Sequence, residues 1–302
     1  MLRAAPEGFL LNPSLKRIAG DIDQMFEAAL IPAAHGATRL HEAMRYAVIG
    51  GGKRLRPLLV AASAGLFGVP RSRALRAGLA VECIHAHSLI HDDLPCMDDD
   101  DLRRGKPTVH RAFDEATAVL AGDALHALAF EVLSDPRTHP DAAVRAELVC
   151  ELAKAVGAAG MAGGQMLDLL ADGRGFDLAE ITRMQRLKTG ALIGWCLEAG
   201  AIMGYAAPAL RRSLRGYSQC IGLAFQIADD LLDAEGDERT VGKRIGKDAA
   251  QGKETFVSLL GAPRARAQAE LLVSQAVDHL KSFGEDGEIL RAVARFTIER
   301  KN

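Results

Sequence analysis

Aromatic residues are scarce in this sequence of 302 residues. Phe, Trp and Tyr together make up 5% of the chain, with a single Trp, whereas hydrophobic residues of all kinds make up 49%. The interior must therefore be built largely from Leu, Ala, Ile, Val and Met. Because Leu, Ala and Met are strong helix formers, this composition favours helices.

An excess of charge of one sign is also missing. The chain has 37 Lys and Arg against 39 Asp and Glu, for a formal net charge of −2. It therefore has no overall field that would attract nucleic acid or an anionic membrane. Nucleic acid is not expected as a partner, and any recognition of anions must be local.

Long apolar runs and paired cysteines are lacking too. The apolar stretch Pro57–Pro70 is well short of the roughly 20 residues that span a bilayer, so no stable membrane insertion is expected. The first residues have only a short apolar run before Lys16, which makes a poor signal peptide. The five cysteines are odd in number and scattered, without a C-x-x-C pair. This pattern argues against a disulfide framework and fits a reducing cytoplasm.

Apolar residues recur at three- and four-residue steps along most of the chain, as Leu15, Ile18 and Ile22 do. This is the period of amphipathic helices, and prolines fall near the expected breaks. No convincing alternating strand, repeat or low-complexity linker is visible, so we expect a single all-α domain over residues 1–302. The predicted helices are Ser14–Leu30, Thr38–Val48, Pro57–Leu66, Arg71–Asp93, Val109–Leu133, Ala142–Leu170, Leu178–Gly200, Ala209–Asp233, Thr255–Leu260, Arg264–Phe283 and Glu288–Glu299.

Six aspartates are concentrated in HDDLPCMDDDDLRRGK, residues His91–Lys106, and basic residues follow them at once. Asp92 and Asp93 end a predicted helix because Pro95 cannot continue it, and Asp98 belongs to the following turn. So much like charge is costly unless a cation is present. Carboxylates suit hard ions, and Mg²⁺ in particular is often shared between protein carboxylates and substrate phosphates. The alternative is an acidic loop in water.

A second acidic cluster, FQIADDLLD, lies inside a predicted helix at Phe225–Asp233. Gln226, Asp229 and Asp233 are spaced to form one polar stripe on this helix. No Lys or Arg at neighbouring turns pairs the acids, so they require another counter-charge. The two clusters together predict several divalent ions held between helices, with an anionic substrate completing their coordination.

Cations beside glycines supply sites for such an anion. GGGKRLRP, residues Gly50–Pro57, contains three of them, and Lys188-Thr189-Gly190 and Gly242–Lys253 contain more. GGGKR is not a Walker loop, because Ala47 stands at the position of its first glycine and Arg54 at that of its Ser or Thr. A nucleotide triphosphatase is therefore disfavoured.

Two other metal sites are disfavoured by the sequence. His87 and His91 lie four residues apart on a predicted helix and could ligate zinc. The H-E-x-x-H signature is absent, however, and no full ligand set is apparent. The D-x-D-x-D-G spacing of a calcium loop is missing as well.

The chain resembles short-chain trans-polyprenyl diphosphate synthases, most of all the bacterial farnesyl diphosphate synthases. The resemblance runs from about Lys53 to Leu260 and rests on an ordered set of motifs: GGKRLRP, HSLIHDDLPCMDDDDLRRGKPTVH, LAGDAL, GGQMLDL, LKTG, FQIADDLLD and GKRIGKDAAQGKETF. It implies an all-α bundle around a deep central cavity, usually in a homodimer.

The resemblance also implies roles for particular residues. The implied ligands of several Mg²⁺ ions that bind an allylic diphosphate are Asp92, Asp98 and Asp229, with support from Asp93, Asp230 and Asp233. The implied remaining contacts to that diphosphate are Arg103, Lys188, Thr189, Gln226 and Lys243, with Lys253 nearby. The implied isopentenyl diphosphate site comprises Gly52, Lys53, Arg56, His85 and Arg104.

The implied reaction is the condensation of isopentenyl diphosphate with dimethylallyl or geranyl diphosphate to give farnesyl diphosphate, which has 15 carbons. Five residues before Asp92, roughly 7.5 Å along a helix, His87 would lie near the floor of the tail pocket beside Ser88. Bacterial farnesyl synthases often have an aromatic residue there, and geranylgeranyl synthases a smaller one. We therefore expect the C15 product, with C20 as the alternative.

Two further alternatives remain. A terpene cyclase of the same fold would share the aspartate clusters, but it has no second diphosphate to hold, so GGKRLRP and Arg104 argue against it. A non-catalytic partner subunit would be expected to have lost its motifs, whereas both clusters are intact here.

Overall fold

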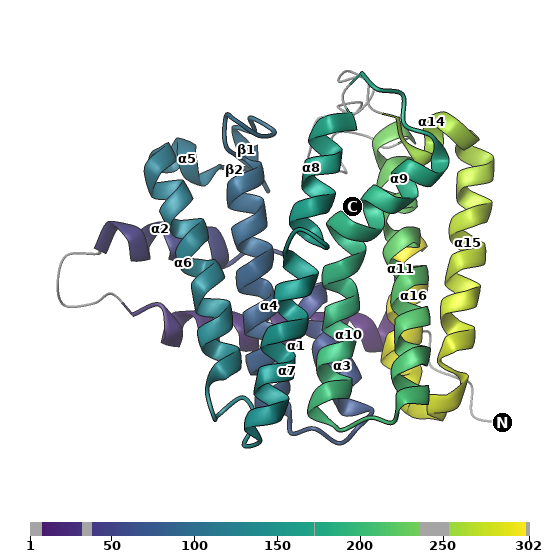
Figure 1. Ribbon diagram of the computed structural model, residues 1–302, viewed down its shortest axis with the longest axis horizontal. Helices are drawn as coiled ribbons and strands as arrows, with labels where there is room; N and C mark the ends of the chain where they lie inside the picture. Colours follow the sequence, from purple (N-terminus) through teal and green to yellow (C-terminus); the bar gives the residue numbers. More distant parts are fainter. Residues whose placement is uncertain (1–7, 32–37, 172, 236–253, 300–302) are drawn as a thin grey trace. The chain divides into compact units, whose positions relative to one another are not determined.

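The computed structural model describes residues 8–31, 38–171, 173–235 and 254–299 (Figure 1). Within these ranges the chain is helical except for loops and one small hairpin, in which β1 (Leu102–Arg103) pairs antiparallel with β2 (Lys106–Pro107). The all-α prediction is therefore confirmed, although the two short strands were not foreseen. Two-residue strands are too short to show an alternating pattern.

The chain divides into two compact units, which are described separately. The N-terminal unit comprises residues 12–61 and 69–149, and the C-terminal unit comprises residues 1–11, 62–68 and 150–302. The elements that lie wholly or mostly in the N-terminal unit are α1 (Gly8–Ala29), α2 (Thr38–Val48), α3 (Leu55–Gly65), α4 (Arg71–Asp92), β1, β2, α5 (Val109–Ala112) and α6 (Glu115–Ser134). Helix α7 (Ala142–Val156) passes from this unit into the next.

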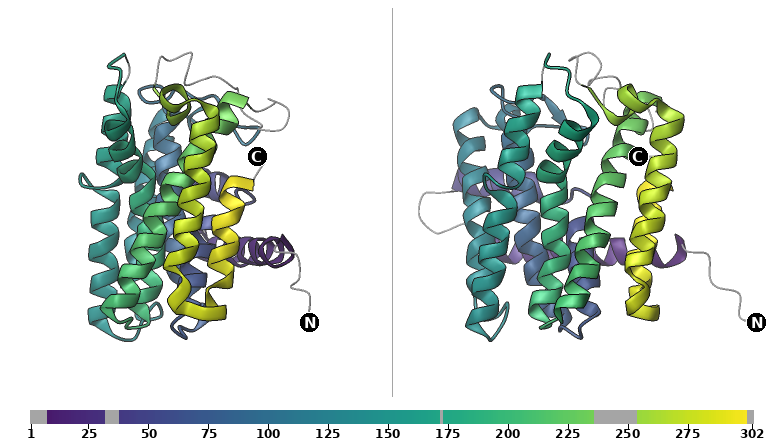
Figure 2. Two further views of the ribbon diagram at one scale, coloured as in Figure 1. Left: turned by 90° about the vertical axis from the view of Figure 1, so that its right-hand side faces the viewer. Right: turned by 45° about the vertical axis from the view of Figure 1, so that its right-hand side comes forward.

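The described elements of the C-terminal unit are again all helical. They are α8 (Met161–Ala171), α9 (Leu178–Gln185), the π-helical segment η1 (Arg186–Gly190), α10 (Ala191–Met203), α11 (Pro208–Glu235), α14 (Phe256–Leu260), α15 (Ala262–His279), the 3₁₀ segment η2 (Lys281–Gly287) and α16 (Glu288–Glu299). Helices α11 and α15 pack side by side, as the views in Figure 2 show. Tyr217 of α11 is fully buried, and its hydroxyl donates to the Leu290 carbonyl at 2.6 Å.

Helices α4 and α6 form the main pairing of the N-terminal unit and run side by side in Figure 1. Small residues make this approach close. A Cβ placed on Gly122 of α6 would lie 2.5 Å from Cδ2 of His91 on α4, so the glycine leaves space for the imidazole. Helix α6 is also long and apolar enough to cross a membrane, which the sequence reasoning overlooked. Core helices of globular proteins pass the same test, and α6 packs against α4 in this way.

Three predicted helices prove to be interrupted. Val109–Leu133 breaks after Ala112 because the Asp114 side chain accepts the Thr117 N–H at 2.6 Å and caps a new helix. Ala142–Leu170 breaks at a glycine-bounded turn, Gly157–Gly160, where helix propensity is low. The third interruption lies within Leu178–Gly200, where five residues take π-helical geometry instead of continuing the α-helix.

Smaller differences concern the ends of helices. Helix α1 begins at Gly8 rather than Ser14, with Pro13 inside it, and α3 begins at Leu55 rather than Pro57. The helix predicted over Arg264–Phe283 ends at His279 and continues as the 3₁₀ segment η2.

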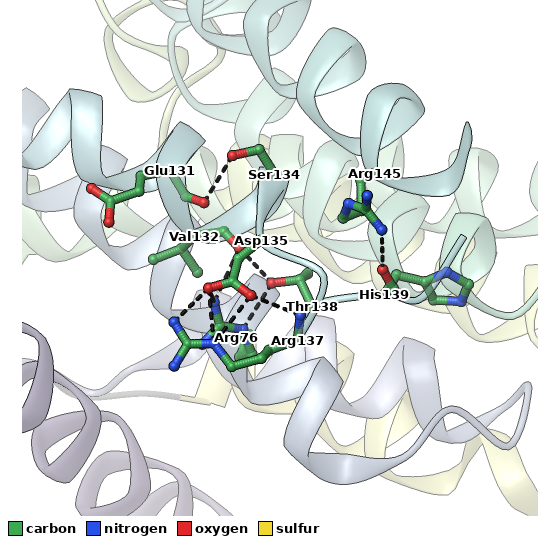
Figure 3. A network of polar contacts seen from close by, with 9 residues as sticks. All are labelled: Arg76, Glu131, Val132, Ser134, Asp135, Arg137, Thr138, His139 and Arg145. Carbon is green, nitrogen blue, oxygen red and sulfur yellow. Dashed lines mark hydrogen bonds and ion pairs between the residues drawn. The ribbon is translucent and has the colours of Figure 1, made fainter. Parts of the chain in front are cut away.

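A polar network around Asp135 closes the turn after α6 (Figure 3). The Arg137 backbone N–H and its Nε donate to the Asp135 carboxylate at 2.7 and 2.8 Å, and Arg76 Nη2 of α4 lies 3.0 Å from the same group. Arg76 Nε also donates to Thr138 Oγ1 at 2.9 Å. The hydrogen bonds hold the pKa of Asp135 well below its ordinary value. The network ties the end of α6 to α4.

Candidate active site

The first acidic cluster lies at the C-terminal end of α4 and in the turn that follows. Helix α4 ends at Asp92, and the Asp98 N–H donates back to the Asp92 carbonyl at 2.9 Å. This bond folds the turn so that the backbones of the two residues are adjacent. Both side chains are half-buried, whereas Asp99, at a positive φ of 50°, is exposed. The turn therefore brings together two of the carboxylates that the sequence assigned to metal.

Asp93 is engaged differently from its neighbours. It is only 3% exposed, and its two carboxylate oxygens accept from Arg103 Nε at 2.8 and 2.9 Å, while Arg103 Nη2 lies 2.5 Å from Oδ1. Burial raises the pKa of the Asp93 carboxyl, and the ion pair with Arg103 opposes that rise. Asp93 therefore fixes the guanidinium of Arg103, which stands on the β1–β2 hairpin.

The glycine turn before α3 lies against a second arginine of the hairpin. Gly52 has a positive φ of 89°, and a Cβ placed on it would lie 2.8 Å from both terminal nitrogens of Arg104. The absence of a side chain thus lets the Arg104 guanidinium lie directly over this turn. Arg56, four residues further along, has a buried Nε with no hydrogen-bond partner within the described part of the chain.

Arg54 holds the segment between Gly52 and Arg56 in place through buried polar contacts. Its backbone has a positive φ of 51°, and the residue is only 4% exposed. Its guanidinium donates to Glu82 Oε1 at 2.8 Å, to Asp23 Oδ1 at 2.7 Å and to the Val48 carbonyl. Burial lowers the pKa of Arg54, but Glu82 and Asp23 together raise it above its ordinary value. The interactions hold the segment between Gly52 and Arg56 in one conformation.

His85 of α4 lies close enough to these arginines for their charges to act on its imidazole. Burial, reinforced by the charges of Arg56 and Arg104, holds the pKa of His85 well below its ordinary value. The imidazole is therefore neutral at neutral pH. The structure thus places Gly52, Arg56, His85 and Arg104 in one cationic cluster of the N-terminal unit, and Lys53 is next to Gly52 in the chain.

The second acidic cluster lies near the end of α11 in the C-terminal unit. Asp229 and Asp233 are one turn apart, and Asp230 Oδ2 accepts the Phe256 N–H at 2.8 Å. All three aspartates, together with Gln226, are half-buried, so this is not a fully solvated face. The Asp230 contact ties the start of α14 to the cluster.

Lys188 and Thr189 lie in the π-helical segment η1, a geometry that is frequent at functional sites. Lys188 Nζ donates to Asp168 Oδ2 of α8 at 2.5 Å. A Cβ on Gly164 of α8 would overlap the Lys188 backbone and lie 2.5 Å from its Cα. Helix α8 thus fixes both the backbone and the ammonium group of Lys188. Lys243 and Lys253 lie outside the described residues.

Residues 37–294 match the polyprenyl synthetase family. The chain belongs to this family. The match extends over both units, so it includes the two acidic clusters and the cationic cluster. It confirms the predicted family and the assignment of the chain as a prenyltransferase.

Individual relatives agree with this polyprenyl synthetase assignment. The chain is 47% identical to the farnesyl diphosphate synthase of Escherichia coli (strain K12) over 92% of this chain and 95% of that protein. It is also 47% identical to geranylgeranyl pyrophosphate synthase 11, chloroplastic, of Arabidopsis thaliana, over 87% of this chain and 75% of that protein. A crystal structure of an FPP/GFPP synthase from Zymomonas mobilis superposes with a TM-score of 0.88 at 56% identity, covering 95% of this chain and 98% of that one.

Sequence reasoning on this polyprenyl synthetase missed several polar residues of the site. Asp168 and Gln165 lie in the quoted motif GGQMLDL but were given no role, and both amide atoms of Gln165 are buried with no hydrogen-bond partner in the described ranges. Their place inside a motif was the available signal. Glu82 and Asp23 had no such signal, because their partner Arg54 is far from both in the sequence.

Proposed function

We propose that this polyprenyl synthetase condenses isopentenyl diphosphate with dimethylallyl or geranyl diphosphate to give farnesyl diphosphate. The observation that carries this proposal is the cationic cluster at Gly52, Arg56, His85 and Arg104. Arg104 lies over Gly52, whereas Arg103 is paired with Asp93, so the N-terminal unit holds a cationic cluster as well as the acidic Asp92 turn. A terpene cyclase would need only one diphosphate site.

The donor set suits Mg²⁺, because half-buried aspartate carboxylates are the hard oxygen ligands that this ion prefers. The residues proposed to hold several ions are Asp92, Asp98 and Asp229, with support from Asp93, Asp230 and Asp233. Bound Mg²⁺ would neutralise charge on the allylic diphosphate as its C–O bond breaks. Since Asp93 already holds Arg103 in place, its support would be to keep that guanidinium directed at the diphosphate.

Charged and polar side chains of the protein are proposed to make the remaining contacts to the two diphosphates. Arg103, Lys188, Thr189 and Gln226 are proposed to bind the allylic diphosphate, with Lys243 and Lys253 from outside the described residues. Fixed positive charge stabilises the leaving group without reorganisation at the moment of reaction. Gly52, Lys53, Arg56, His85 and Arg104 would hold isopentenyl diphosphate, whose double bond attacks the carbocation. No protein nucleophile is required, and apolar walls would keep water from the cation.

The direct test uses purified protein with isopentenyl diphosphate, dimethylallyl diphosphate and Mg²⁺. Mass spectrometry should detect a C15 diphosphate as the main product. Chelation with EDTA should abolish its formation and added Mg²⁺ should restore it. Absence of any elongated product under these conditions would contradict the proposal.

We further propose a cytoplasmic homodimer, which light scattering on the same preparation would distinguish from a monomer.

Product length should depend on His87 of α4, which with Ser88 lies in the turns before Asp92. We expect His87→Ala to lengthen the product toward C20, because the side chain that limits the tail pocket becomes smaller. His87→Tyr is the matched control and should keep the product at C15. The products of the two variants and of the unchanged chain would be compared by mass spectrometry. If all three proteins gave the same distribution of product lengths, His87 would not form the floor of the tail pocket. The geranylgeranyl diphosphate alternative would then be tested with other substitutions.

A further inference from the structure

Three histidines and one aspartate gather between α4 and α6 in the N-terminal unit. His87 and His91 lie one turn apart on α4, and Asp123 and His126 lie on the facing side of α6. One donor atom from each of His87, His91 and Asp123 falls within 4.8 Å of the other two. The ring of His87 is 4.4 Å from that of His91 and 4.9 Å from that of His126, measured between centroids.

The helix packing described above is what brings these groups together. Gly122 gives the His91 ring room against α6, next to Asp123 in the chain. His91 Nε2 lies 3.1 Å from the Val119 carbonyl oxygen and 3.9 Å from Asp123 Oδ1. A neutral imidazole that donates from Nε2 to this carbonyl has its lone pair on Nδ1 and would bind an ion there, an arrangement that orients metal-binding histidines in proteins. Binding through Nε2 would instead replace this hydrogen bond.

His87 contributes the least expected feature of the group. Its Nδ1 is buried and has no hydrogen-bond partner among the residues that the structure describes. Burying a polar atom without a partner is unfavourable, so such atoms are uncommon in folded proteins. Burial, with smaller contributions from His91 and His126, lowers the pKa of His87 to about 4.

We propose that His87, His91 and Asp123 bind one ion of the Zn²⁺, Co²⁺ or Ni²⁺ class, with His126 or water completing its coordination. Two imidazoles and one carboxylate are typical ligands of these ions, whereas the aspartate clusters offer only hard oxygen. Bonds of 2.0–2.1 Å in a tetrahedral site place the ligand atoms about 3.3 Å apart. The donors would therefore close by about 1.5 Å at most, which side-chain rotation on two packed helices can supply.

This site does not use the aspartate clusters and does not depend on the proposed reaction, although it shares His87 with the proposed floor of the tail pocket. It also revises the sequence-based argument against zinc, which lacked a third ligand. That ligand comes from α6, and only the packing of α6 on α4 shows that Asp123 faces the two histidines.

Cobalt spectroscopy tests the proposal, because four-coordinate Co²⁺ with nitrogen ligands absorbs visible light far more strongly than six-coordinate Co²⁺ among oxygens. Metal-free full-length protein would be titrated with Co²⁺ in excess Mg²⁺, which occupies the aspartate clusters. We expect one strongly absorbing ion per chain, and its displacement by Zn²⁺. His87→Gln and Asp123→Asn should weaken Co²⁺ binding at least about tenfold.

Two matched controls locate the ion. His41→Gln changes a histidine of α2, and Asp98→Asn changes the aspartate turn, so both should keep the absorption band. The Asp123 side chain is 62% exposed, so Asp123→Asn is expected to fold normally, which circular dichroism would verify. The proposal is overturned if no strong band forms, or if the band survives both His87→Gln and Asp123→Asn. Loss of the band in Asp98→Asn alone would place the ion in the aspartate turn and would equally overturn it.

Discussion

Replacing Glu82 by glutamine should lower the free energy of unfolding by about 3 kcal/mol, the cost of breaking a buried ion pair by removing one partner. The Glu82 and Arg54 side chains are only 4% and 2% exposed, and their charged atoms are 2.8 Å apart. Glutamine keeps the size and shape of the side chain but removes its charge. The Arg54 guanidinium would then remain buried. Among the described residues, Asp23 would be the acidic partner left to it.

Glu27→Gln provides a matched control on a surface pair. Glu27 pairs with Arg45, but the two side chains are 51% and 31% exposed. Exposed ion pairs contribute about 0–1 kcal/mol, because water and salt screen them. Urea denaturation of both variants measures the difference directly. Equal, small losses in the two would show that the buried pair does not stabilise the protein as its burial indicates.

The same substitution should weaken binding of isopentenyl diphosphate. Arg54 holds a strained positive-φ conformation between Gly52 and Arg56, and the pair with Glu82 is what fixes it. Once the pair is lost, the residues proposed to contact this substrate would no longer be held in place. We expect the KM for isopentenyl diphosphate to rise in Glu82→Gln, while the KM for the allylic substrate changes less. A uniform fall in activity, with both KM values unchanged, would instead indicate a general loss of folded protein.

Local patterns in the sequence were enough to predict the helices and the acidic clusters. Thr38–Val48 and Glu288–Glu299 have the predicted bounds, because an apolar period with clear ends specifies an isolated helix well. Pro95 likewise predicted the end of α4 to within one residue, since the helix was expected to end at Asp93 and ends at Asp92. Such features depend on residues within a few positions of one another, so one sequence contains all that is needed.

Interruptions of helices were harder to predict, since the apolar period continues across them. Asp114 resembles any other polar residue between apolar ones, and only its hydrogen bond to the Thr117 N–H shows it to be a cap. The π-helical segment at Arg186–Gly190 similarly inserts its extra residue without a break in composition. Competing local geometries of similar energy decide these positions, and tertiary packing selects among them.

Long-range polar partners could not be predicted at all. The pairs Arg54–Glu82 and Lys188–Asp168, and the approach of Asp123 to His91, join residues that are 20 or more positions apart. Their formation depends on which helix faces meet, which no local pattern specifies. The candidate site was therefore predicted in its charges and motifs, whereas the residues that hold those charges in position emerged only from the fold.

Gly164→Ala should lower the free energy of unfolding by about 1–3 kcal/mol and reduce kcat, because its methyl group would overlap a neighbouring backbone. A Cβ at this position lies 2.5 Å from Lys188 Cα and 2.8 Å from the Leu187 carbonyl carbon. Backbone atoms cannot rotate away as a side chain can, so α8 and η1 must move apart. This movement would also displace the Lys188 ammonium from Asp168, and with it a proposed contact to the allylic diphosphate.

Gly190→Ala is the matched control within η1 itself. A Cβ on Gly190 meets its nearest described atoms at 3.7 and 3.9 Å, which is ordinary contact, and its φ of −64° suits alanine. This variant should be as stable as the unchanged chain, or more stable by up to about 1 kcal/mol through helix propensity. Urea denaturation and steady-state kinetics would be measured on both variants. If Gly164→Ala proved as stable as Gly190→Ala, the close packing of α8 on Lys188 would not be what positions this residue.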